Sequence, residues 1–227
     1  MNHQPATEQP SEDELWWASV EEFSEREAEL LRALDWAGVE RLAREYFERA
    51  ESGYAAALFA QSRANSLAAL GRDSESLAAS ELAEQLAPVE PYFKLNLARR
   101  LIGEFARPAE GLAKLVEAEP LLEANMRTGW LTEKGLGLLA LGRDAEAVEC
   151  FRELTTPERL SRMRTWDRAF LVDLRLVSRL VGKRLVPKLC VAYLEAAEAI
   201  GFRHDPDRLG PVRELLNEAR AAGRGIE

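Results

Sequence analysis

The segment ALGRDSES at residues 69–76 recurs almost unchanged as ALGRDAEA at residues 140–147. In both copies a helical pattern ends before the glycine and a new one begins after it. Glycine suits a helix end because it adopts the left-handed conformation without the steric cost that other residues incur. The aspartate that follows can cap the next helix. The repeated segment therefore predicts a tight turn between two helices.

Turns of this kind interrupt the helical pattern at five places, which are Asp35, Gly71, Gly103, Gly142 and Gly182. Spacings of 32 to 40 residues between turns are typical of stacked helix pairs, since one pair cannot bury its apolar face alone. The pattern predicts hairpins over residues 11–51, 53–88, 89–120, 121–157 and 158–202. A capping helix over residues 207–222 is expected to follow them, and residues 1–10 are expected to form a flexible tail.

The composition supports an all-helical chain. Ala, Leu, Glu and Arg dominate, and the β-branched residues that favour strands are sparse. Two cysteines and two histidines are too few for a disulfide framework, a four-ligand zinc site or most histidine-based catalysis. No apolar run approaches the roughly 18 residues of a membrane span, and the polar N-terminus does not resemble a signal peptide. We therefore expect a cytoplasmic protein without a membrane partner, and the excess of Arg over Lys suits a bacterial genome.

Small residues, turn glycines, prolines and some aromatic and leucine residues recur at matching places in three of the predicted hairpins. They are Ala64, Gly71, Ser76, Ala83 and Pro88 in the first of these, Tyr92, Leu95, Gly103 and Pro120 in the second, and Gly135, Leu138, Gly142, Ala147 and Phe151 in the third. This spacing resembles the W-x2-L-G-x2-Y, A-x3-F and P pattern of the tetratricopeptide (TPR) family. Asn96, Arg99 and Arg175 depart from the pattern. The resemblance implies an all-α fold in which residues 11–227 form a single domain, a right-handed α-solenoid of about five hairpins.

The resemblance also implies a binding surface. In TPR proteins the first helices of successive hairpins line a concave groove that takes a peptide or a partner helix. The residues of this chain that match the groove are Asn65, Phe93, Lys94, Leu97, Arg100, Glu133 and Leu136. Asn65, Lys94 and Arg100 are similar in type to the set with which some TPR domains hold a terminal carboxylate. An open groove would leave the apolar members of the surface exposed, whereas a closed polar pocket would favour a different kind of ligand.

Charge is unevenly distributed along the chain, whose net charge is −9. Residues 1–50 hold 13 acidic and 5 basic side chains, or −8, whereas residues 151–190 hold 10 basic and 4 acidic side chains, or +6. Four arginines in the basic stretch fall within about 60° of one helix face, namely Arg164, Arg168, Arg175 and Arg179. They are candidates for an anion site, or else form a solvated face. The acidic and basic stretches could also attract each other between chains.

The sequence carries no catalytic, metal-binding or cofactor-binding motif in a suitable context. Residues 135–140 match the G-x-G-x-x-A dinucleotide fingerprint in letters, but that fingerprint requires a preceding strand, and the segment here is helical. We therefore expect no enzyme and no cofactor, but a protein–protein interaction scaffold or adapter that binds a peptide or partner helix in its groove. The alternative is a regulatory protein that binds an anionic ligand or nucleic acid through the arginine band at 159–188. We expect no nucleic-acid partner, because the chain as a whole is acidic.

Overall fold

The computed structural model describes residues 12–50, 52–156, 168–204 and 209–223. Within these ranges the regular elements are eleven α-helices and one short 3-10 helix, so the prediction of an all-α chain is confirmed. None of the helices that the structure describes is long and apolar enough to cross a membrane. The predicted tail at 1–10 and residues 158–167 of the fifth predicted hairpin lie outside the described residues.

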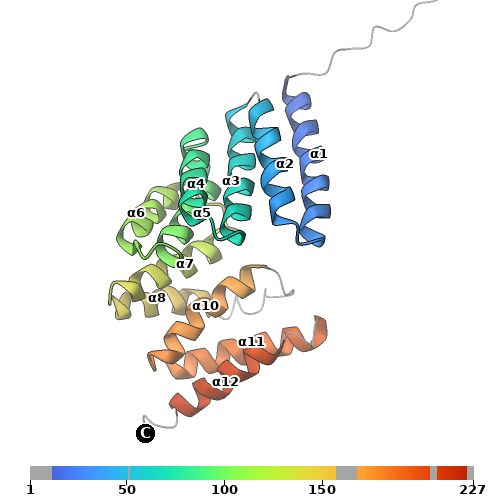
Figure 1. The fold of residues 1–227 in the computed structure, drawn as a ribbon. Coiled ribbons are helices and arrows are strands. Elements are labelled where there is room, and N and C mark those ends of the chain that lie inside the picture. Colours follow the sequence, from blue (N-terminus) through green and yellow to red (C-terminus); the bar gives the residue numbers. More distant parts are fainter. Residues whose placement is uncertain (1–11, 51, 157–167, 205–208, 224–227) are drawn as a thin grey trace, which may run out of the picture. The chain divides into compact units, whose positions relative to one another are not determined.

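The chain divides into two compact units, Met1–Phe93 and Lys94–Glu227. The single repeat domain expected over residues 11–227 stays a prediction. Unit 1 contains α1 (Glu12–Arg32), α2 (Trp36–Arg49), α3 (Gly53–Ala69), α4 (Asp73–Leu86) and the first residues of α5 (Pro91–Gly103). From α1 to α4, each helix packs against the next in chain order (Figure 1).

The core of unit 1 combines an aromatic cluster with an alanine-rich helix contact. Phe23, Tyr46 and Phe59, from α1, α2 and α3, contact one another edge to face with ring centroids 4.8 to 5.5 Å apart. A second cluster surrounds the buried ring of Phe93 with alanines of α3, of α4 and of the residue after α4, namely Ala57, Ala60, Ala83 and Ala87. Alanines at these positions let the two helices approach closely, because larger side chains would hold them apart.

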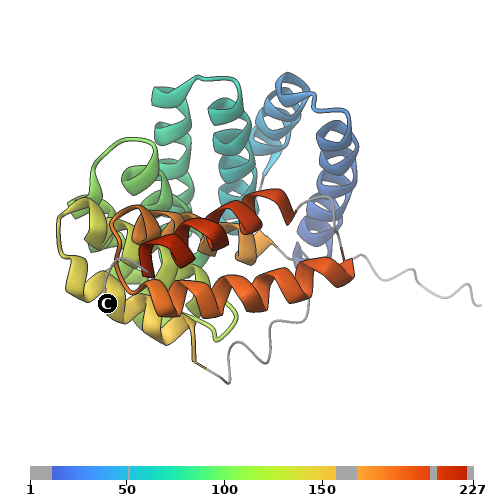
Figure 2. The same ribbon diagram turned by 90° about the horizontal axis from the view of Figure 1, so that it is seen from below.

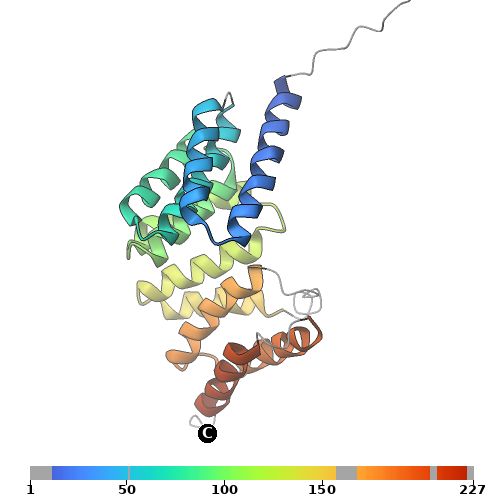
Figure 3. The ribbon, with the colours of Figure 1, turned by 45° about the vertical axis from the view of Figure 1, so that its right-hand side comes forward.

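Unit 2 contains the remainder of α5, followed by α6 (Pro108–Ala118), the 3-10 helix η1 (Glu119–Leu121), α7 (Arg127–Ala140), α8 (Asp144–Leu154), α10 (Arg168–Gly182), α11 (Pro187–His204) and α12 (Gly210–Gly223). Helix α7 packs against α6, α8 and α10, and its contact with α8 and α10 can be followed in Figure 3. Helices α11 and α12 lie against each other (Figure 2). One continuous apolar core joins these helices and includes Trp130, Phe151, Leu176 and Tyr193.

Every helix-to-helix turn inside a predicted hairpin contains at least one residue at positive φ. These residues are Leu34, Gly71, Ala106, Gly142 and Arg184, and the last turn also contains Val186 at a φ of 41°. In four of the turns the next N–H donates to the carbonyl five residues earlier, as in Arg72 N to Leu67 O at 2.9 Å, which is the hydrogen bond of a Schellman motif. The left-handed conformation predicted at Gly71 and Gly142 is confirmed. Gly103 and Gly182 instead end helices α5 and α10.

The prediction that aspartate caps the second helices is wrong for α4 and α8. The N-caps of α4 and α8 are Arg72 and Arg143, and Asp73 and Asp144 are the first helical residues. Each N-cap arginine instead forms two hydrogen bonds with a glutamate three residues later, and α6 has the same arrangement. The pairs are Arg72–Glu75, Arg107–Glu110 and Arg143–Glu146, with N–O distances of 2.5 to 2.8 Å. Three successive hairpins thus share one local structure, named here the Arg–Glu clamp.

Candidate ligand-binding pocket

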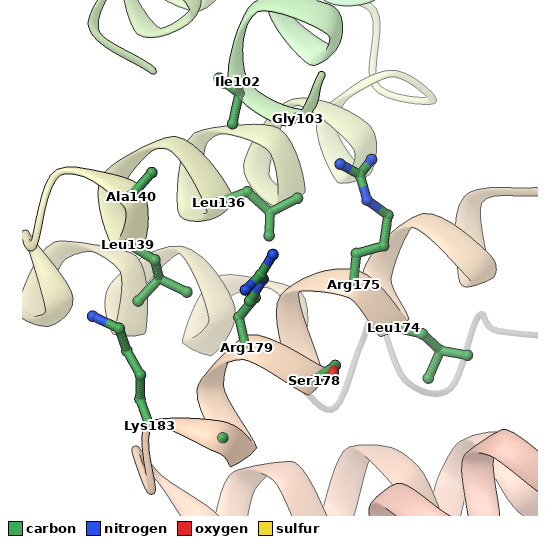
Figure 4. A pocket seen from close by; sticks show the side chains of 11 residues that line it. Ile102, Gly103, Leu136, Leu139, Ala140, Leu174, Arg175, Ser178, Arg179 and Lys183 are labelled. Carbon is green, nitrogen blue, oxygen red and sulfur yellow. The ribbon is translucent and has the colours of Figure 1, made fainter. Parts of the chain in front are cut away.

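A cavity of about 790 Å³ lies in unit 2 between the end of α5, the second half of α7 and helix α10 (Figure 4). It is lined by Ile102, Gly103, Leu136, Leu139, Ala140, Leu174, Arg175, Ser178, Arg179, Gly182 and Lys183. Within the described residues, this lining comes from the first helices of the third, fourth and fifth predicted hairpins and from Lys183 directly after α10. Helices α6, α8 and α11, which are second helices, contribute no lining residue.

Two features position helix α7, one at Trp130 and the other at Gly135. The indole of Trp130 donates to the carbonyl of Leu115 at 2.8 Å, and Lys134 and Arg127 lie over its ring at 4.3 and 4.6 Å. Further along the helix, a Cβ on Gly135 would lie 2.9 Å from a methyl of Leu176 on α10. The glycine therefore allows α10 to approach α7 closely, as expected for helix packing rather than for a dinucleotide loop.

Two walls of different character face the cavity. Ile102, Leu136 and Leu139 provide apolar groups from α5 and α7. Arg175 and Arg179 are four residues apart, which places them about 6 Å apart along one side of α10. Lys183 continues the four-residue spacing directly after the helix. These three cations form the basic wall of the cavity. In Figure 4 the side chains of Arg175 and Arg179 extend from α10 toward α7. No acidic side chain belongs to the lining in the part of the chain that the structure describes.

Arg175 is held by a carboxylate at the edge of the pocket. Its Nη1 donates to Oε1 of Glu133 at 3.3 Å, and Nε of Arg99 donates to the same oxygen at 2.9 Å. Glu133 is only 1% exposed, and its Oε2 has no hydrogen-bond partner within the described structure. Because a buried carboxylate requires compensating cations, this cluster links α5, α7 and α10. The tip of Arg175 also lies 2.8 Å from the position that a Cβ of Gly103 would occupy.

The other two cations of the basic wall differ in their partners. Lys183 forms an ion pair with Asp144, with Nζ 2.7 Å from Oδ1. Arg179 lies between Lys183 and Arg175 in the series and is exposed. Among the residues of the described ranges, no side chain forms an ion pair or hydrogen bond with Arg179. Within the described residues, Arg179 is therefore the cation of this wall that has no carboxylate partner.

The structure brings two of the predicted anion-site residues together with one of the predicted groove residues. Arg175, Arg179 and Leu136 line the same cavity. Arg164 lies outside the described residues, and Arg168 begins α10 with its side chain outside them. The sequence interpretation missed Lys183, although it continues the four-residue spacing of the arginines. It also missed Ile102 and Gly103, for which the local sequence carries no signal.

The prediction of an open groove needs correction at several of its residues. All of the predicted groove residues except Asn65 are buried, since the side chains of a first helix also pack against neighbouring helices. They are Phe93, Lys94, Leu97, Arg100, Glu133 and Leu136. Lys94 pairs with Glu117 at 3.2 Å and Arg100 with Glu104 at 2.9 Å.

Asn65 belongs to unit 1, is exposed and accepts a hydrogen bond from Gln61 at 3.1 Å. The terminal-carboxylate hypothesis also requires the cations Lys94 and Arg100, and each of these already has a carboxylate partner within the chain.

The remaining reactive groups do not point to catalysis. Burial raises the pKa of the Cys150 thiol and raises the pKa of Cys190 to about 12, so both thiols stay protonated near neutral pH. No group of three or more His, Cys, Asp or Glu side chains is placed to hold a metal ion among the residues described. Comparisons with protein-family models, curated proteins and solved structures each return no match. The geometry of the pocket is therefore the basis for inferring what the protein binds.

Proposed function

We propose that this protein is a non-catalytic TPR-like interaction module that binds a segment of another protein in the pocket between α5, α7 and α10. The observation that carries the proposal is the origin of the lining residues. They come from the first helices of three successive predicted hairpins, together with Lys183. The TPR resemblance assigns the partner-binding surface to these helices. An adapter of this kind needs a shaped surface and no catalytic group.

The proposal includes the finer architecture, a right-handed solenoid of five hairpins with α12 as the capping helix. Three repeated features support it. The hairpin turns share a left-handed residue, three second helices begin with the Arg–Glu clamp, and the fifth residue after the left-handed one is small and buried in each of those three hairpins, namely Ser76, Gly111 and Ala147. A crystal structure in which the hairpins stack with the opposite hand, or do not stack, would contradict this architecture.

The character of the two walls supports an acidic and partly apolar partner segment. A cavity of about 790 Å³ has the size of a typical ligand site, which takes a few side chains rather than a folded domain. The basic wall favours acidic side chains, and the leucines favour apolar ones. This combination favours a protein segment over nucleic acid, since the lining formed by the described residues has no aromatic side chain on which a base could stack. Leu136 of the predicted groove and Arg175 and Arg179 of the predicted anion site then belong to one surface.

A peptide-display selection tests the proposal without knowledge of the natural partner. The full-length protein is used to select from a random twelve-residue library, in parallel with two tryptophan variants. Ser178→Trp places a large side chain in the pocket from an exposed position of α10. Ala109→Trp places the same side chain at an exposed position of α6, a second helix, and serves as the control.

We expect the wild-type protein to enrich peptides that combine acidic and apolar residues. The Ala109→Trp variant should bind these peptides as the wild type does, and Ser178→Trp should bind them at least tenfold more weakly. The proposal is wrong if no peptide is enriched, or if the enriched peptides bind Ser178→Trp unchanged. Sedimentation at low and high salt identifies the competing case, in which the acidic N-terminal hairpin of a second copy occupies the basic wall.

A further inference from the structure

We infer that the pocket recognises a single carboxylate flanked by apolar side chains, and that Arg179 is the residue that contacts it. The inference rests on the proposed function and specifies the chemistry of the anchor in the partner segment. Its starting point is the distribution of charge over the three cations of the basic wall, which determines how many negative charges the pocket accepts.

Two of the three cations already contact a carboxylate of the chain. Arg175 shares the buried Glu133 with Arg99, and Lys183 pairs with Asp144. Within the described residues, Arg179 has no such partner. A ligand that carries several negative charges must therefore compete with two carboxylates of the protein. A ligand with one negative charge pairs with Arg179 and leaves both internal pairs intact, so the pocket favours the single charge.

The surroundings of Arg179 specify what accompanies the carboxylate. In Figure 4 its guanidinium reaches toward Leu136, with Leu139 nearby on the same helix. A carboxylate bound there would accept charge-assisted hydrogen bonds from the guanidinium. The side chains next to it in the ligand would contact Ile102, Leu136 and Leu139, which makes leucine-like neighbours favourable. Because apolar side chains flank it, the carboxylate is that of an Asp or Glu side chain within the partner segment.

Short blocked peptides test this inference by calorimetry on the full-length protein. The first peptide is Ser-Leu-Glu-Leu-Ser with an acetylated start and an amidated end. The second replaces the central Glu with Gln, the third is the Gln peptide with a free terminal carboxylate, and the fourth has three consecutive Glu residues between the leucines. The first two differ only in one charge, the third tests the chain end as the source of the carboxylate, and the fourth tests the preference for a single charge.

We expect the Glu peptide to bind at least tenfold more tightly than the blocked Gln peptide. Arg179→Met should remove most of this difference, and Arg179→Lys should retain part of it. Arg44→Met is the control, because Arg44 is an exposed arginine of α2 with no ion-pair partner in the described ranges. The free-end peptide should bind no better than the blocked Gln peptide, and binding as tight as that of the Glu peptide would overturn the assignment to an acidic side chain.

The inference is overturned if the Glu and Gln peptides bind equally, if Arg179→Met retains the full difference, or if the three-Glu peptide binds more than tenfold better than the single-Glu peptide. A failure of this inference differs from a failure of the proposed function. If the library selects peptides that depend on the pocket but tolerate Glu→Gln, only the carboxylate anchor is wrong. If the library and the short peptides all fail to bind, both conclusions fall.

Discussion

At Gly103 the absence of a side chain makes room for the guanidinium of Arg175. We predict that Gly103→Ala weakens binding of the Glu peptide several-fold, because the new Cβ displaces Nη2 from its position 2.8 Å away. Stability should stay the same or rise by up to about 1 kcal/mol, since Gly103 is helical and alanine is the better helix former. Calorimetry and urea unfolding measure the two effects.

Gly129→Ala is the matched control for this change, since Gly129 is also helical and a Cβ there meets no atom within 4 Å. The control should gain stability and bind the peptide normally. Equal peptide affinity of Gly103→Ala and the wild type would show that the position of Arg175 does not matter for binding.

The left-handed residues of the turns carry a second prediction at the residue scale. Ala106 has φ of 51°, a conformation that costs a residue with a side chain about 1–2 kcal/mol. Ala106→Gly should therefore raise the free energy of unfolding by about 0.5–1 kcal/mol. Gly142→Ala, at φ of 73°, should lower it by about 1–2 kcal/mol. Urea unfolding measures both, and a loss of stability in Ala106→Gly would contradict the prediction.

Single residues also show how far sequence reasoning reaches. Gly71 and Gly142 could be predicted as left-handed because glycine is visible in the sequence as the residue that adopts this conformation most readily. Ala106 and Arg184 could not, since the closing of the helix end imposes their conformation. Arg175 and Arg179 could be paired from their four-residue spacing. Gly103 reaches the same pocket from α5, which is a tertiary contact that no local pattern encodes.

At the scale of elements, the Arg–Glu clamps give α4, α6 and α8 the same start. The arginine hydrogen bonds hold the pKa of Glu75, Glu110 and Glu146 below their usual value of 4.5. A pKa that is lower in the folded state means that the clamp stabilises the fold above pH 4.5 and that this contribution is lost as the pH falls through the lower value. Each clamp is exposed, so its contribution to stability is small.

Carbon-detected NMR titration of the glutamate carboxyl groups checks this prediction. The three clamp glutamates should titrate below pH 4.5. In Arg143→Gln the pKa of Glu146 should return toward 4.5, while the pKa values of Glu75 and Glu110 remain low. An unchanged pKa of Glu146 in this variant would show that Arg143 is not the cause of the shift.

The buried Glu133 provides a prediction about the contact between α5, α7 and α10. Replacing both of its cations in Arg99→Gln/Arg175→Gln leaves a buried carboxylate without charge compensation, which should lower stability by about 3 kcal/mol. Adding Glu133→Gln to the double variant removes the buried charge and should restore much of the loss. Chemical denaturation of the double and triple variants measures the two effects. If the triple variant is no more stable than the double variant, Glu133 is not the origin of the loss.

At the scale of the whole molecule, the helical class could be predicted from composition and from the spacing of glycine and proline. The chemistry of the binding site could be predicted only in outline. The sequence shows a stretch of +6 at residues 151–190 but does not show that Glu133 and Asp144 compensate two of its cations. These internal pairs are the basis for the proposed preference of the pocket for one negative charge. Such pairings arise from tertiary contacts across 39 to 42 residues of sequence.

NMR mapping of the blocked Glu peptide on the isotope-labelled full-length chain locates the binding site. We expect the largest backbone shift changes at residues 102–103, 136–140 and 174–183, which come from α5, α7, α10 and the residue after α10. They should saturate together, with one affinity. Changes concentrated on the second helices α6, α8 and α11, with none near Arg179, would contradict a binding site formed by the first helices.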